Sequence, residues 1–220
     1  MVAAQYYITK LINTFKSEGR RLYPLILTHL NPNYFKNFAF SNQKVYFLDK
    51  SEIQPNTAIV KLLKKRNDDL IKEDVSKFLL HFHSDEINKR EQFKALDLRE
   101  TWGEGNNFHN FIGGKAKKYV EDGKGFDPLS VCCAVRISVE RRAYELLADD
   151  EHRREFLRKT YTRKKLSYAE SIGVSIPEYF YLLGVIYNDA MHWREDQDNI
   201  SPIAAKLENQ VIRGLIAEVI

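Results

Sequence analysis

The chain has few of the residues that mark disulfide-rich or fibrous proteins, and it has no long apolar run. Its 220 residues include two cysteines, ten glycines and six prolines, which excludes a disulfide scaffold and a collagen-like repeat. Cys132 and Cys133 are adjacent, so they form neither a CxxC metal pair nor an easy intramolecular disulfide. No apolar run has membrane-spanning length, and the N-terminus lacks the pattern of a signal peptide. We therefore expect a cytoplasmic protein with no membrane partner.

What is present is the composition of a folded protein of modest size. Hydrophobic residues make up 44% and charged residues 29% of the chain, enough for one globular domain or two small ones. This is short for an enzyme built on a large nucleotide-binding sheet. The formal net charge is +4, and the basic excess lies in residues 1–125. Such an excess permits contact with nucleic acid or an acidic partner, and is equally compatible with a solvated surface.

The first 54 residues carry the strand signals of the chain. Residues 2–17 place apolar side chains at helical intervals, and Gly19 follows as a stop. Residues 24–28 and 44–48 are short apolar runs typical of buried parallel strands, and a short helix is expected between them. Two parallel strands cannot cover their own faces and edges. We therefore expect a two-stranded α/β element that needs neighbours which this chain does not obviously supply.

From residue 55 onward the periodicity is helical. Helices are expected at 57–66, 70–84, 86–100, 107–121, 128–148, 151–171, 177–191 and 202–219. Asp127 and Pro128 form an N-cap and a first-turn proline for the long helix, on which Arg136 and Glu140 are expected away from the apolar stripe. The predicted fold is mainly α. It divides into the α/β element at 1–54, a helical connecting region at 55–125, and a C-terminal four-helix bundle at 126–220.

A histidine follows the first predicted strand. His29 stands at the carboxyl end of residues 24–28, where open α/β sheets place their ligands. The run Leu-Ile-Leu-Thr-His at 25–29, with a helix and then Val-Tyr-Phe-Leu-Asp at 45–49, resembles the C-terminal end of ATPase domains of the ABC/SMC-like superfamily. The resemblance covers about residues 1–50. It implies that His29 is a switch histidine for the γ-phosphate; the alternative is a strand-end histidine without a ligand.

The phosphate-binding loop of such ATPases is absent from the sequence. No G-x-x-x-x-G-K-[ST] motif occurs, and no strand ends in paired acids that would hold Mg²⁺. The resemblance implies that the chain is a C-terminal fragment or split subunit of an ATPase, without ATP hydrolysis of its own. It would bind no cofactor in isolation, and ATP and magnesium would be bound only with an upstream core.

The C-terminal region carries a second resemblance. Its motifs are Asp-Pro-Leu-Ser at 127–130, Ala-Val-Arg at 134–136, Leu-Leu-Gly-Val-Ile-Tyr-Asn at 182–188, and His192. Residues 126–220 look like the helical tail that follows the ATPase core in bacterial AAA/ABC-type proteins, many of them linked to phage defence. The resemblance implies a tail used for dimerisation, or for recruitment of an effector or nucleic acid. The implied partners are a second copy or an upstream ATPase chain.

Asn188 and His192 form a candidate catalytic pair. They are four residues apart, so they share one helix face on which the histidine could act as acid/base and the amide as orienter. The pattern resembles, incompletely, the R-x4–6-H element of HEPN ribonucleases. Positions 185–187 lack the expected arginine; Arg136 or Arg194 could replace it in space. A structural histidine favoured by the helix dipole is the alternative.

A basic run is the candidate nucleic-acid interface. It consists of Arg153, Arg154, Arg158, Lys159, Arg163, Lys164 and Lys165. With Tyr161 and Tyr168 interleaved, the run could follow a phosphate backbone of DNA or RNA and stack on bases. The alternative is internal compensation by Glu195, Asp196 and Asp198.

No metal site is expected. His81 and His83 are two residues apart, and on a helix such positions face different directions.

Overall fold

The protein is mainly helical. The computed structural model describes residues 2–23, 56–192 and 200–220, and it divides the chain into two units, 1–50 and 51–220. In the first unit, α1 (Val2–Ser17) confirms the predicted helix, and Gly19 follows it with a positive φ of 69°. The predicted strands at 24–28 and 44–48, and His29 between them, lie outside the described residues.

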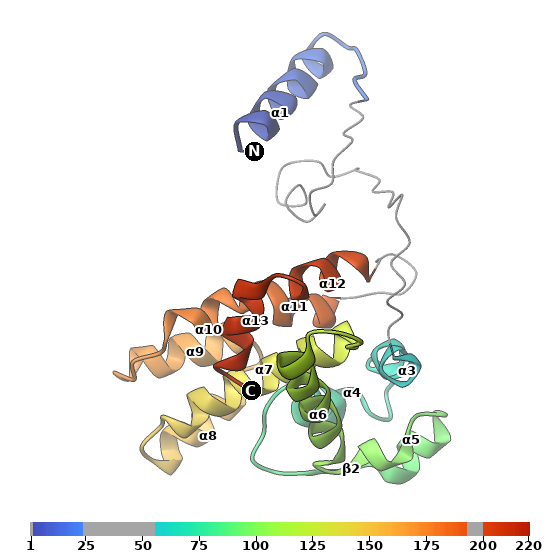
Figure 1. Cartoon of the computed structure of the whole chain (residues 1–220), viewed down its shortest axis with the longest axis vertical. Helices are drawn as coiled ribbons and strands as arrows, with labels where there is room; N and C mark the ends of the chain where they lie inside the picture. The colour runs from blue at the N-terminus through green and yellow to red at the C-terminus, as the bar shows by residue number, and fades with distance from the viewer. Residues whose placement is uncertain (1, 24–55, 193–199) are drawn as a thin grey trace. The chain divides into compact units, whose positions relative to one another are not determined.

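The described residues of the second unit form a compact helical assembly with one small sheet (Figure 1). Its first half contains α3 (Thr57–Lys65), α4 (Lys72–Asp74), the π-helical turn η1 (Val75–Leu79), β1 (Ile87–Asn88), α5 (Arg90–Ala95), the 3-10 turn η2 (Glu100–Gly103), β2 (Glu104–Gly105) and α6 (Asn107–Asp122). Its second half contains α7 (Pro128–Glu145), α8 (Asp150–Arg158), α9 (Thr162–Ser171), α10 (Glu178–Leu182), α11 (Gly184–His192), α12 (Ser201–Leu207) and α13 (Gln210–Ala217).

Helix α7 is the central element of the second unit. The Asp127 side chain accepts a hydrogen bond from the Ser130 amide and Pro128 occupies the first turn, as the sequence predicts. Most of α7 is buried because it packs against α6, α9, α11 and α12. Arg136 and Glu140 are buried with the apolar residues, which corrects the expectation that they lie on other faces of the helix.

Three predicted C-terminal helices are each divided in two. The segment 151–171 forms α8 and α9, because the chain is extended at Lys159 and Tyr161 and turns back on itself. The segment 177–191 forms α10 and α11, and 202–219 forms α12 and α13, where the Asn209 side chain caps the new helix. The region is therefore a layered assembly of shorter helices in place of the four long helices predicted.

The segment 70–105 departs most from the prediction. Helices were expected over 70–84 and 86–100, yet helical structure is limited to 72–79, α5 and η2. β1 and β2 pair antiparallel, with Ile87 opposite Gly105. The buried Trp102 ring meets Phe108 edge-on and anchors the neighbouring turn to α6. The observed sheet is thus a separate feature from the predicted α/β element.

One apolar core unites helices on both sides of residue 125. Buried side chains from α3, α6, α7, α9 and α13 belong to the same hydrophobic cluster. Cys132 and Cys133 are buried free thiols in it, as expected for core residues, and burial raises the pKa of Cys133 to about 12. No helix within the described ranges has both the length and the apolar composition for crossing a membrane.

Candidate functional site

A buried polar network lies inside the apolar core. We call it the Glu140 network; it consists of His81, Arg136, Glu140, Thr162 and Lys165. Glu140 is 0% exposed and its carboxylate accepts four hydrogen bonds. Oε1 accepts from Nδ1 of His81 at 2.7 Å and from the Thr162 hydroxyl at 2.6 Å. Oε2 accepts from the Phe82 amide at 2.9 Å and from Nζ of Lys165 at 2.6 Å, so both oxygens are fully used.

The two ring nitrogens of His81 have different partners. Its Nδ1 faces Glu140, and its Nε2 lies 3.3 Å from a terminal nitrogen of Arg136. The ring therefore links the carboxylate of Glu140 to the guanidinium of Arg136. The other terminal nitrogen of Arg136 donates to Oδ1 of Asn188 at 3.0 Å. The network therefore runs from the buried Glu140 to the exposed Asn188.

The electrostatics of the network favour an ionised carboxylate. Burial alone would raise the pKa of Glu140, but the His81 ring and the Lys165 ammonium that face it hold that pKa well below its usual range. Burial lowers the pKa of the Arg136 guanidinium, and the charge of Glu140 acts in the opposite direction. Arg136 stays protonated because an arginine is not deprotonated in proteins.

The candidate catalytic pair is only partly described. Asn188 lies on α11 with its side chain exposed, whereas His192 is described only as the last residue of that helix. Arg136 of α7 contacts Asn188 and lies over the Tyr187 ring at 5.6 Å, so the structure places a cation beside the Asn188 amide. Arg194 lies outside the described residues.

The basic run lies on the α8–α9 hairpin, but its members differ in exposure. Arg154, Arg158, Arg163 and Lys164 are exposed, while Arg153 and Lys159 are half-buried. Lys165 is 1% exposed and bound to Glu140, so it does not share the surface predicted for it. Its position three residues after Thr162 turns both side chains toward the same carboxylate.

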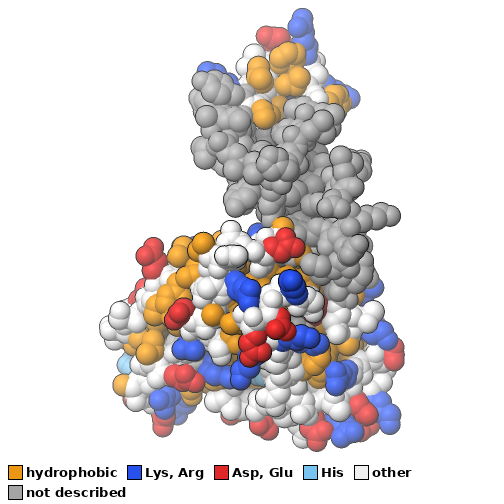
Figure 2. Space-filling view, viewed as in Figure 1, with side chains coloured by type: hydrophobic (Ala, Val, Ile, Leu, Met, Phe, Trp, Pro, Cys, Tyr) orange, Lys and Arg blue, Asp and Glu red, His pale blue; other side chains and the backbone are white. Residues whose placement is uncertain are grey.

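Nearby acids pair with part of this run. Arg158 and Lys159 both contact Glu155, and Arg153 contacts Asp150. The acidic residues 195–198, expected to compensate the run, lie outside the described residues. On the face shown in Figure 2, basic and acidic side chains are interspersed. Any nucleic-acid contact here would therefore compete with these acids for the basic side chains.

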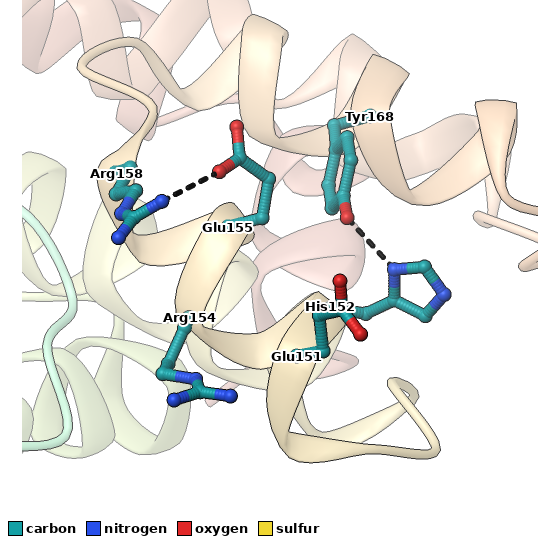
Figure 3. Close-up of a pocket in the computed structure, with 6 residues that line it drawn as sticks. All are labelled: Glu151, His152, Arg154, Glu155, Arg158 and Tyr168. Atoms are coloured by element: carbon teal, nitrogen blue, oxygen red, sulfur yellow. Dashed lines mark hydrogen bonds and ion pairs between the residues drawn. The ribbon is translucent and has the colours of Figure 1, made fainter.

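A hollow of about 340 Å³ opens between α8 and α9 (Figure 3). It is lined by Glu151, His152, Arg154, Glu155, Arg158 and Tyr168. Dashed lines in Figure 3 mark the bond from His152 to the Tyr168 hydroxyl, 2.8 Å, and the contact of Arg158 with Glu155. The lining contains two acidic side chains, Glu151 and Glu155, and two basic ones, Arg154 and Arg158. The hollow therefore presents no dominant charge to a small ligand.

The two histidines flanking Phe82 have separate surroundings. His81 belongs to the Glu140 network, whereas His83 meets the Phe78 ring and lies 3.5 Å from Asp85. Within the described part of the chain, no group of three His, Cys, Asp or Glu side chains is placed to hold a metal ion.

Sequence reasoning did not identify Glu140, Thr162 or Lys165 as one site. Glu140 stands four residues after Arg136, and this spacing on a mostly apolar helix was the available signal. Lys165 could not be distinguished from the exposed cations before it. Comparison with protein-family models, with curated proteins and with solved structures finds no match for the chain.

Proposed function

We propose that the helical unit binds nucleic acid through the α8–α9 hairpin, as part of an assembly with a nucleotide-hydrolysing core. The observation that carries the binding proposal is the exposure of Arg154, Arg158, Arg163 and Lys164 on one hairpin. Tyr161 is 62% exposed between the two helices, and the Lys164 ammonium lies 5.2 Å from its ring. A protruding aromatic ring beside cations suits a backbone phosphate next to a stacked base.

Phosphate contacts of this kind have a measurable salt signature. Each neutralised phosphate releases condensed counterions and adds about 0.7 on single strands, or about 0.9 on duplexes, to the steepness of log affinity against log salt. The site is small and partly paired with acids, so we expect modest affinity with little sequence preference. Stacking on Tyr161 favours single strands over duplexes.

The test is a double charge reversal in the full-length chain. Arg158→Glu with Lys164→Glu removes two exposed cations, and we expect weaker binding of a labelled single-stranded oligonucleotide and a shallower salt slope. Lys117→Glu with Lys118→Glu is the control, because it makes the same change of charge on exposed positions of α6. Absent binding, salt-insensitive binding, or equal losses in the two variants would contradict the proposal.

The ATPase part of the proposal rests on Thr28 and His29 and on the C-terminal motifs. The chain would act as a fragment or split subunit of a defence-type ATPase, with dimerisation or recruitment as the role of the helical unit. We expect no tight Mg²⁺-dependent ATP binding by these 220 residues alone. A calorimetric titration with Mg-ATP measures this binding. Tight binding would contradict the proposal that an ATPase core outside this chain binds the nucleotide.

A second candidate function is RNA cleavage at α11. The contact between Arg136 and Asn188 favours it, because it places a cation beside the amide of the Asn188 and His192 pair. The test compares cleavage of a labelled RNA by the wild type, Asn188→Ala and His192→Ala. His152→Ala is the control, since His152 lies on α8. Equal rates in all four proteins would exclude this function.

A further inference from the structure

The Glu140 network contains more positive than negative charge. Lys165 and Arg136 supply two cations to the network, and Glu140 supplies its one carboxylate. Lys165 is satisfied, because it donates to Glu140 and also to the Phe82 carbonyl at 3.2 Å. Both carboxylate oxygens of Glu140 are occupied by donors other than Arg136. The surplus positive charge therefore belongs to Arg136.

Arg136 is poorly compensated at its own position. It is 5% exposed, and its Nε is buried without a hydrogen-bond acceptor among the described residues. Glu140 is the carboxylate whose charge acts on it within the described part of the chain. A buried cation without a counterion is costly, and a buried donor without an acceptor adds to that cost. An anionic oxygen beside this guanidinium would supply the missing counterion.

The network opens to solvent at the neighbouring α11. Asn188 accepts from Arg136 through Oδ1, and its exposed side chain leaves the amide donor group at the surface. The Arg136 guanidinium also lies over the Tyr187 ring, 5.6 Å from its centre. A guanidinium and an exposed amide thus meet beside Tyr187.

We propose that Arg136 and Asn188 form a binding site for a phosphate group, at the mouth of the Glu140 network. The phosphate would accept hydrogen bonds from the Arg136 guanidinium and from the Asn188 amide. The planar donors of arginine match phosphate oxygens better than a spherical halide ion. The site deepens the proposed nucleic-acid binding and shares two residues with the second candidate function. Phosphate binding at this site requires no RNA cleavage. It also does not require Arg158 or Lys164, the two residues whose charge is reversed in the α8–α9 test.

Asn188→Asp is the decisive variant. It places a carboxylate beside Arg136 on an exposed position, so it supplies an internal anion without disturbing the core. With inorganic phosphate titrated against chloride at constant ionic strength, we expect the wild-type Nε–H NMR signal of Arg136 to move. Asn188→Asp should bind phosphate about tenfold or more weakly, and should melt at a higher temperature than the wild type in chloride. Asn110→Asp, an exposed asparagine on α6, should bind phosphate as the wild type does.

Two further probes separate the sources of the phosphate group. A nucleoside 5′-monophosphate carries a terminal monoester, and an oligonucleotide without terminal phosphates carries only diesters. Displacement of inorganic phosphate by either probe supports the site and identifies the source. The site is refuted if phosphate leaves the Arg136 signal unmoved or if Asn188→Asp binds phosphate as tightly as the wild type. Arg158→Glu with Lys164→Glu should retain phosphate binding, which distinguishes failure of this site from failure of the α8–α9 surface.

Discussion

The Lys165 ammonium lies 2.6 Å from Oε2 of Glu140, and both side chains are buried in the helical core. Removal of one partner leaves the other charge buried without compensation. We predict that Lys165→Met lowers the free energy of unfolding by about 3–5 kcal/mol, measured by urea denaturation. The neighbouring exposed residue gives the control: Lys164→Met should change that free energy by less than about 0.5 kcal/mol. Equal effects of the two substitutions would show that the buried ion pair has no stabilising role.

A half-buried histidine, His109, makes the stability of the fold depend on pH in the mildly acidic range. Burial, with help from the charge of Arg141, lowers the pKa of His109 from 6.5 to about 4. As the pH falls, the unfolded chain binds a proton at this histidine near pH 6.5, whereas the folded chain binds it only near pH 4. The free energy of unfolding therefore decreases as the pH drops through this range. This amounts to at most about 3 kcal/mol.

His109→Gln tests this dependence, because glutamine does not titrate. Its free energy of unfolding should vary less between pH 7 and pH 4 than that of the wild type, measured by urea denaturation at several pH values. His152→Gln, on the partly exposed α8 surface, should keep the wild-type dependence. If the free energy of unfolding of His109→Gln varied with pH as it does in the wild type, the assignment of this dependence to His109 would be refuted.

Arg213 on α13 closes the C-terminus of α6. Its guanidinium donates to the Val120 carbonyl and to the Glu121 carbonyl at 2.7 Å, beside Gly123, whose φ of 64° ends the helix. A lysine offers one donor group without this fork. We predict that Arg213→Lys lowers the melting temperature and costs about 1–2 kcal/mol. Arg163→Lys, on an exposed position of α9, should have little effect; a similar loss there would argue against the specific role of Arg213.

The helical unit should fold without the first unit. Its apolar cluster is built from side chains between Ile59 and Val219, and α7 forms its centre. We predict that a fragment of residues 51–220 melts cooperatively, with near-UV circular dichroism typical of packed aromatic side chains. A broad transition without near-UV signal would show that the core needs residues from the first unit.

Local signals in the sequence predicted the elements whose ends are chemically marked. Asp127 and Pro128 define the start of α7, and a regular apolar pattern defines α1 and α3. The prediction was wrong where tertiary contacts decide the path of the chain. The turn at Lys159–Tyr161 brings Thr162 and Lys165 to Glu140, and periodicity within one segment cannot reveal that distant acceptor.

The candidate sites show the same difference between what local sequence signals predict and what tertiary contacts decide. Exposure of Arg154, Arg158, Arg163 and Lys164 agrees with a basic surface read from sequence. The partnership of Arg136 with Asn188 joins positions 52 residues apart, and that of His81 with Glu140 joins positions 59 apart. Such pairs arise only from the packing of α7 against α11 and the segment after η1, so one sequence could suggest Arg136 as a partner without establishing it.

Asp127 also connects the start of the helical unit to α7. Its Oδ1 accepts from the Asn56 amide at 3.0 Å, while its Oδ2 accepts from the Ser130 amide at the helix entrance. Asn56 is itself the N-cap of α3. The starts of two helices, α3 and α7, therefore depend on one carboxylate, and loss of Asp127 would release both at once.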